Sequence, residues 1–167
     1  MRDENNTCLI ILNVQSGLLV NASTKALPSA IANILKHQQF QHILGTCFIN
    51  EAGSPFVTQR DWKGCMREEE HVVVPSIQSA CEQIFYLPAY TCFTPAMESY
   101  LESYHIGHLY LCGIDTDGSV LKSAFDAFER GYHVSVFWDC CASSGGSIKH
   151  AAGLCVLKRL LGNENLL

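Results

Sequence analysis

Ser119 is the residue of this chain best placed to act as a nucleophile. It lies in the stretch Leu109 to Asp126, where an apolar run ends at Gly113 and a short polar turn leads into a helical pattern. This order predicts a strand, a tight turn and a helix, with Ser119 in the first helical turn. Free backbone N–H groups and the helix dipole favour a developing negative charge there. The backbone could therefore supply oxyanion donors for a reaction at the Ser119 hydroxyl.

Two further strand ends are expected to meet this turn. The apolar run Cys8 to Leu12 predicts a strand buried on both faces, and Asn13 follows it directly. Gln83 to Leu87 predicts another strand. Because parallel strands present their carboxyl ends at one edge of a sheet, where α/β proteins bind ligands, Asn13 is a candidate site residue. The alternative is a loop amide that only hydrogen-bonds the backbone.

Strand and helix patterns alternate along the chain, which is typical of a doubly wound α/β fold: a mainly parallel sheet between two helical layers. We expect one domain over residues 1–167. Pro28 fits the first turn of a helix that runs to His37. The segment Asp139 to Gly146 is expected to be a loop, and the expected strands cover residues 8–12, 42–49, 83–87, 108–112 and 132–138.

The segment Asn50 to Val74 has no clear periodicity. An irregular segment of this length in a compact domain is usually a functional loop or a lid. Phe56 and Trp62 within it could form the wall of a pocket or an oligomer interface, or simply pack against the domain.

Composition limits the possible partners. The formal net charge is −5 and no basic cluster is present, which disfavours nucleic acid and anionic membranes. The apolar runs are shorter than the ~20 residues of a membrane span. The nine cysteines are odd in number, several lie in apolar runs, and none form a C-x-x-C pair. These features indicate reduced thiols in a cytoplasmic protein.

Sequence motifs for bound cofactors are lacking. There is no G-x-G-x-x-G, no P-loop, and no pair of histidines at ligand spacing beside a carboxylate. We therefore expect neither a cofactor nor a metal ion.

Four blocks of the chain resemble the isochorismatase-like cysteine hydrolase family, which includes nicotinamidases and carbamoylsarcosine amidase-type enzymes. The blocks are L-I-I-L-N-V-Q-S from Leu9, L-P-A-Y-T-C-F from Leu87, G-I-D-T-D-G-S-V-L-K-S-A-F-D-A from Gly113 and G-Y-H-V-S-V-F-W-D-C-C-A-S from Gly131. The resemblance covers most of the chain and implies the family's three-layer fold.

The resemblance also implies three catalytic positions, and all three are replaced. The family uses an aspartate as general base, a lysine that stabilises charge, and a cysteine that attacks an amide or ester carbonyl. Asn13, Leu87 and Ser119 stand at these positions. Asn13 cannot accept a proton at neutral pH, Leu87 carries no charge, and a hydroxyl is a poor nucleophile without a base. The set is self-consistent, because an aspartate facing a leucine would be a buried charge without its partner.

The residues around these three positions match the family pattern. The resemblance implies that the residues binding a ligand lie among Gln15, Tyr90, Phe93, Asp115, Thr116 and Gly118. It also implies a cis peptide in the turn Ile114-Asp115-Thr116. Metal-binding members need an aspartate and histidines after the second strand, whereas Asn50, Glu51 and Ala52 stand there.

Three functions are compatible with these residues. The first is a pseudoenzyme that binds a small carbonyl compound or a protein without hydrolysing it. The second is an active hydrolase of a small amide or ester that uses Ser119, or Cys92 near the Tyr90 block. The third is an assembly role, because relatives often form homo-oligomers.

Overall fold

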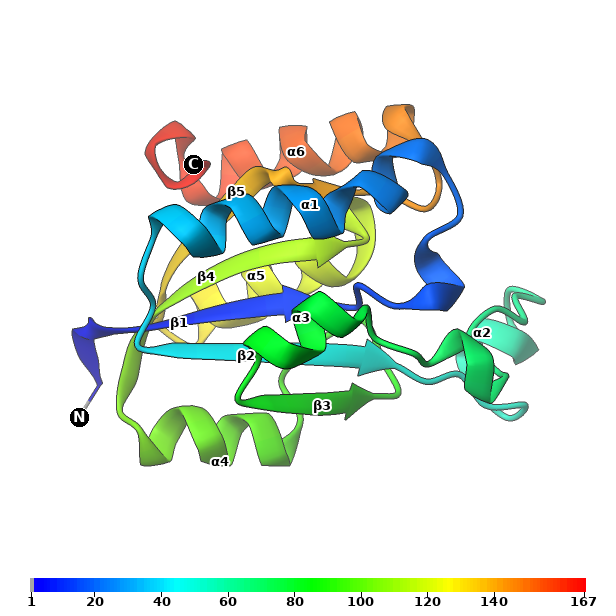
Figure 1. Cartoon of the computed structure of the whole chain (residues 1–167), viewed down its shortest axis with the longest axis horizontal. Helices are drawn as coiled ribbons and strands as arrows, with labels where there is room; N and C mark the ends of the chain where they lie inside the picture. The colour runs from blue at the N-terminus through cyan, green and yellow to red at the C-terminus, as the bar shows by residue number, and fades with distance from the viewer. Residues whose placement is uncertain (1) are drawn as a thin grey trace.

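Five parallel strands form the central sheet. The computed structural model describes residues 2–167. The strands are β1 (Asp3–Leu12), β2 (His42–Phe48), β3 (Gln83–Leu87), β4 (Ile106–Ile114) and β5 (His133–Ala142). They pair in the order β3-β2-β1-β4-β5, as Figure 1 shows.

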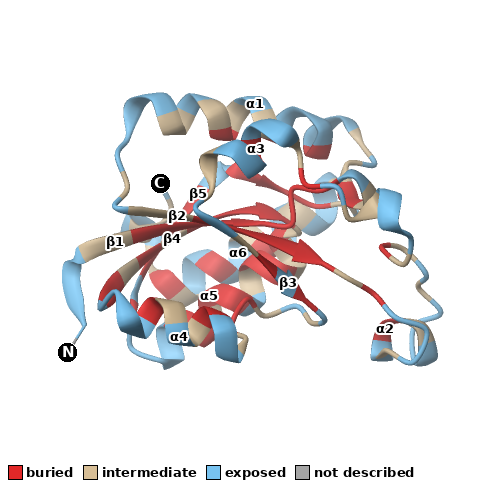
Figure 2. Ribbon diagram, turned by 60° about the horizontal axis from the view of Figure 1, so that its bottom comes forward, coloured by how far each residue is buried: buried red, intermediate tan, exposed pale blue. Residues whose placement is uncertain are grey.

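Helices cover both faces of this sheet, so the predicted three-layer α/β fold is confirmed. In Figure 2, α1 (Ala22–His37) and α3 (Pro75–Ala80) lie on one face, and α4 (Pro95–Ser103), α5 (Leu121–Glu129) and α6 (Ser147–Leu161) lie on the other. The short α2 (Pro55–Thr58) lies beyond the carboxyl ends of the strands (Figure 1).

The core runs along β1, the middle strand. Residues Cys8 to Leu12 are each at most 1% exposed, because the sheet continues on both sides and helices cover both faces. The predicted strand is therefore confirmed, and it begins earlier, at Asp3, where the backbone pairs with Ile106.

Helix α1 begins at Ala22, so the prediction that Pro28 opens it was wrong. The Asn21 side chain accepts from the Thr24 N–H at 2.9 Å, and the Thr24 hydroxyl accepts from the Asn21 N–H at 3.1 Å. This reciprocal cap, together with the burial of Leu27 and Ile31 on the sheet, stabilises a helix that tolerates Pro28 in its interior.

Two other boundaries differ from the sequence expectation. Strand β5 continues to Ala142, because Cys141 and Ala142 pair with Gly113 and Ile114 of β4. The expected loop from Asp139 therefore begins after Ala142. The segment that follows Asn50 contains α2 and a 3-10 turn at Glu68–Glu70, and it is followed by α3, which the sequence analysis did not foresee.

Candidate functional site

Asn13 and Ser119 meet at the carboxyl ends of β1 and β4. The Asn13 amide nitrogen donates a hydrogen bond to the Ser119 hydroxyl oxygen at 3.0 Å, and both side chains are buried. Asn13 has a φ of +53°, in the left-handed region that asparagine tolerates better than most residues. Of the three strand ends that were expected to converge, those that carry Asn13 and Ser119 meet in the structure.

Thr46 of β2 completes a chain of neutral hydrogen bonds. Its hydroxyl donates to the Asn13 side-chain oxygen at 2.6 Å and accepts from the Asn13 N–H at 3.1 Å. The amide of Asn13 is thus fixed at both ends, by Thr46 and by Ser119. Sequence analysis missed Thr46; its only signal was a hydroxyl within an otherwise apolar strand.

Ser119 lies in a single π-helical turn, Thr116–Val120, that leads into α5. The Val120 N–H closes this turn by donating to the Asp115 carbonyl at 3.0 Å, and the peptide bond between Ile114 and Asp115 is cis, as the resemblance implied. Gly113 precedes the turn with a φ of +122°, and a Cβ atom there would lie 2.1 Å from the Leu12 carbonyl oxygen. Only glycine lets β4 pass so close to β1 at this point.

Leu87 is the last residue of β3 and is fully buried. Its carbonyl accepts from the Ile49 N–H at 2.9 Å, which ties the ends of β2 and β3 together. Its side chain is apolar and lies outside the lining of the cavity that contains Asn13 and Ser119.

A small cavity of about 80 Å³ opens beside Asn13 and Ser119. Aromatic rings form much of its wall: Phe56 packs edge-on against both Phe48 and Tyr90, with ring centroids 4.8 Å apart in each pair. The complete lining is Asn13, Leu18, Phe48, Phe56, Arg60, Trp62, Tyr90, Asp115, Ser119 and Ser144. Phe56 and Trp62 therefore lie on a pocket wall, one of the alternatives the sequence left open.

One basic and one acidic side chain belong to this lining. Arg60, which the sequence analysis did not single out, donates to the Tyr90 hydroxyl from an exposed position. Asp115 accepts from the Ser144 N–H at 2.5 Å and from its hydroxyl at 3.0 Å. Burial raises the pKa of Asp115 above the ordinary range, and the two hydrogen bonds from Ser144 oppose that rise.

Of the residues expected to bind a ligand, some line the cavity and others do not. Tyr90 and Asp115 line the cavity, whereas Gln15, Phe93, Thr116 and Gly118 lie outside its lining. Gln15 is buried and bonds both the N–H and the carbonyl of Phe48, at 2.7 and 2.9 Å.

Two of these residues contact side chains on the α5–α6 side of the molecule. Thr116 shares a 2.7 Å hydrogen bond with His150, and the Arg130 guanidinium lies 4.5 Å from the centre of the Phe93 ring. Thr116 and Phe93 therefore contact α6 and the end of α5, outside the lining of the cavity.

Within residues 2–167, no three His, Cys, Asp or Glu side chains gather in a way that could hold a metal ion. No helix in the same range has the length and apolar content needed to cross a membrane.

The family assignment comes from the chain as a whole. A family model described as "Isochorismatase domain" matches residues 7–163, which is nearly the full sequence. The chain belongs to the isochorismatase family. A curated relative, isochorismatase domain-containing protein 2 from Xenopus laevis, is 34% identical over 56 residues, which is 33% of this chain and 27% of that protein. The match thus spans about a quarter of that relative's length.

Solved structures of isochorismatase-like proteins share the fold. An isochorismatase-like hydrolase from Alkaliphilus metalliredigens superposes with a TM-score of 0.79 at 14% identity, over 92% of this chain and 91% of the other. N-carbamoylsarcosine amidase from Thermoplasma acidophilum gives a TM-score of 0.77 at 16% identity, over 97% and 94%. PnC1 from L. infantum, in complex with nicotinate, gives 0.76 at 17% identity, over 100% and 98%.

Proposed function

We propose that this isochorismatase-family chain is a pseudoenzyme that binds a small carbonyl compound without hydrolysing it. The observation that carries the proposal is the hydrogen-bond chain from Thr46 through Asn13 to Ser119. Every member of that chain is neutral and none is a base.

The direction of these bonds argues against attack by Ser119. The Asn13 amide donates to the Ser119 oxygen and cannot remove its proton. General-base help typically contributes ~10²–10⁴-fold in rate, and this site supplies none at Asn13. The buried Leu87 likewise offers no cation that would stabilise an ionised partner.

An active hydrolase with another nucleophile is less well supported. Cys92 is fully buried, does not line the cavity, and burial raises the pKa of its thiol to about 12. A thiol of this kind is almost entirely protonated at neutral pH and is a weak nucleophile. Asp115 is the one carboxylate of the lining, and both of its oxygens already accept hydrogen bonds from Ser144.

The cavity supports binding and limits the size of the ligand. Its volume of about 80 Å³ compares with the ~150 Å³ engineered cavity that holds benzene. A compound such as acetamide or urea is of suitable size. A larger ligand requires the Arg60–Tyr90 contact and the aromatic wall to move.

The test is the triple variant Asn13→Asp, Leu87→Lys, Ser119→Cys. The natural chain should not hydrolyse acetamide, nicotinamide or p-nitrophenyl acetate in a Ser119-dependent manner, and the triple variant should gain turnover. A matched control carries Ser119→Ala with the other two changes and should stay inactive. Urea unfolding of all variants shows whether the triple variant is folded. Hydrolysis by the natural chain that disappears in Ser119→Ala would overturn the proposal, whatever the triple variant does.

We also propose that the protein is cytoplasmic and homo-oligomeric. All nine cysteines are free, and seven of them are buried, which supports a reducing compartment. Multi-angle light scattering on the purified chain measures the oligomeric state, and a monomer at every concentration would contradict the second part.

A further inference from the structure

The Asp115 carboxyl group lies on the wall of the cavity beside Ser119 without a cationic partner. Among residues 2–167, no Lys, Arg or His nitrogen lies within 4.0 Å of its oxygens. Burial is the main cause that raises its pKa, the charge of Asp117 raises it further, and the hydrogen bonds from Ser144 and the charge of Lys149 oppose the rise. A cation that reached this carboxyl group would stabilise its charged form.

Aromatic side chains make up much of the remaining lining. They are Phe48, Phe56, Trp62 and Tyr90, and neighbouring rings among them lie with their centroids 4.8 to 6.0 Å apart. The negative faces of aromatic rings attract organic cations, and clusters of such rings recognise ammonium ligands in proteins. The lining therefore favours a positively charged group beside Asp115.

Arg60 is the one basic residue of the lining, and it defines the alternative, an anionic ligand. Its side chain is exposed and donates to the Tyr90 hydroxyl. Water and salt strongly screen an exposed charge, whereas a partly buried charge acts through a medium of lower dielectric constant. Asp115 is partly buried, so it should influence the charge of the ligand more than Arg60 does.

Ser119 can supply a hydrogen bond to a carbonyl group in the same cavity. Its oxygen accepts from the Asn13 amide, so its own O–H is available to donate to a carbonyl oxygen. Ser119 and Asp115 both line a space of about 80 Å³, so one small molecule can touch both side chains. A compound with an ammonium group one carbon away from its carbonyl group has the size and the groups that these contacts require.

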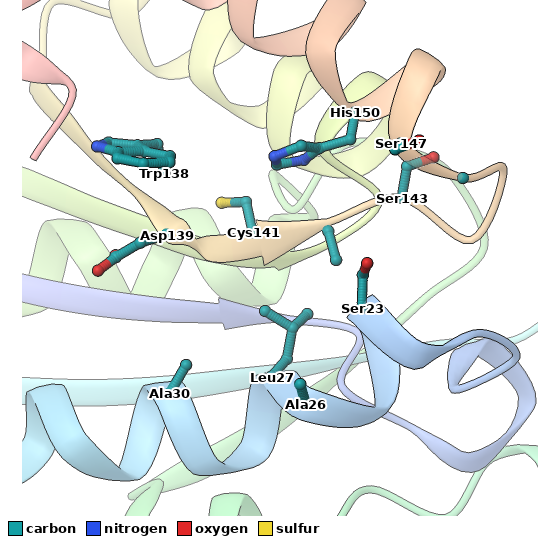
Figure 3. Close-up of a pocket in the computed structure, with 12 residues that line it drawn as sticks. Ser23, Ala26, Leu27, Ala30, Trp138, Asp139, Cys141, Ser143, Ser147 and His150 are labelled. Atoms are coloured by element: carbon teal, nitrogen blue, oxygen red, sulfur yellow. The ribbon is translucent and has the colours of Figure 1, made fainter.

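The groove between α1 and α6 contains similar residue types without the same burial. It lies beside β5, encloses about 350 Å³ and has Trp138 and Asp139 in its lining (Figure 3). Both of these residues are exposed, so solvent weakens the attraction between Asp139 and a cation. This groove beside β5 therefore provides an internal comparison for the cavity.

We propose that the cavity beside Ser119 binds a small α-amino carbonyl compound, with the ammonium group at Asp115 and the carbonyl oxygen at Ser119. This inference rests on the proposed binding function and names the class of ligand. Asp115 supplies the opposite charge, the aromatic rings attract the ammonium group, and the Ser119 hydroxyl donates to the carbonyl oxygen.

Three small amides that differ in one group test the preference for charge. Glycinamide carries an ammonium group, glycolamide carries a neutral hydroxyl, and oxamate carries a carboxylate. In a Trp138→Phe chain, Trp62 is the sole tryptophan and lines the cavity, so its fluorescence reports binding. At neutral pH and constant ionic strength, glycinamide should bind about tenfold more tightly than glycolamide, and oxamate should bind more weakly than both. Ligand-observed NMR repeats the comparison on the natural chain.

Two variants and one further chain are matched to this comparison. Asp115→Asn should make glycinamide and glycolamide bind equally. Asp117→Asn removes a carboxyl group from the same turn but outside the lining of the cavity, and it should preserve the difference. In a Trp62→Phe chain, Trp138 reports on the groove beside β5, and its emission should not respond to any of the three amides.

Equal binding of glycinamide and glycolamide in the chain that retains Asp115 would overturn the proposal, and so would a failure of all three amides to bind. Tighter binding of oxamate would also overturn it and would assign the selection of charge to Arg60. Release of ammonia from these amides that disappears in Ser119→Ala would instead overturn the proposed absence of hydrolysis, and it would leave the preference for an ammonium group standing.

Discussion

The cavity beside Ser119 and the groove beside β5 belong to the same sheet but differ in what they leave open. Beside the cavity, Thr46 of β2, Asn13 after β1 and Ser119 in the turn after β4 hydrogen-bond one another, and the space left is about 80 Å³. In the groove, the edge of a strand faces about 350 Å³ between two helices. The ends of strands collect polar side chains, whereas the edge of a sheet presents backbone groups.

Two kinds of interaction hold the residues around the candidate site: main-chain hydrogen bonds with packing, and hydrogen bonds between side chains. The turn before α5, the buried Gln15 and the aromatic wall are held by the backbone and by packing. The polar side chains of Thr46, Asn13 and Ser119 hydrogen-bond one another. The following variants test how strongly each region depends on that neutrality.

Leu87→Lys is expected to have the largest effect. It puts an ammonium group at a fully buried position without a partner, which typically costs about 3–5 kcal/mol. Urea unfolding should show this loss, and Asn13→Asp in the same chain should restore part of it by supplying an opposite charge. Leu87→Met is the volume-matched control and should cost less than about 1.5 kcal/mol. A charge tolerated at Leu87 without loss would mean that water reaches this position.

Thr46→Val is expected to rank second. It removes the donor to the Asn13 side-chain oxygen and leaves that buried atom unsatisfied, at a cost of about 1–3 kcal/mol. Thr46→Ser keeps the hydroxyl and is the control. Because both neighbours act through Asn13, Thr46→Val and Ser119→Ala should not be additive in the free energy of unfolding. Strict additivity would indicate that Thr46, Asn13 and Ser119 do not act as one hydrogen-bonded unit.

Asp115 should make stability depend on pH. Because burial raises the pKa of Asp115 in the folded state, ionisation of this carboxyl favours the unfolded state. Below the ordinary pKa of an aspartate, about 3.9, the difference in stability between the natural chain and Asp115→Asn should not vary with pH. The natural chain should then lose stability relative to that variant as the pH rises toward the raised pKa. Denaturation midpoints measured across this range test the sign, and Ser144→Ala, which removes one donor to Asp115, should enlarge the difference. Parallel pH profiles of the two chains would contradict the assignment.

Ala26→Glu should change the free energy of unfolding least, by within about 0.5 kcal/mol, because Ala26 is exposed on the wall of the groove. Ala26→Gln, which adds similar bulk without charge, is the control. Urea unfolding measures the effect, and a loss for Ala26→Glu far above that for Ala26→Gln would contradict the exposed placement of residue 26.

Much of this site could be predicted from the sequence because its information is local. The strands Cys8 to Leu12 and Gln83–Leu87 follow from apolar sequence patterns, and the blocks around Asn13 and Ser119 predict the family that the family model confirms. The residue type at each position decides whether it can ionise, and that property needs no coordinates.

The tertiary structure alone decided which residues meet. Thr46 and Arg60 joined the site because the ends of β2 and the segment around α2 come to lie beside Asn13 and Tyr90, and no spacing in the chain encodes that distance. Pro28 likewise became an interior helix residue because a cap at Asn21 outweighed its local preference. The groove beside β5 exists only once the sheet order leaves that strand at an edge between two helices. Residue types determine the local chemistry, whereas hydrogen-bond partners and exposed sheet edges depend on contacts between segments far apart in the chain.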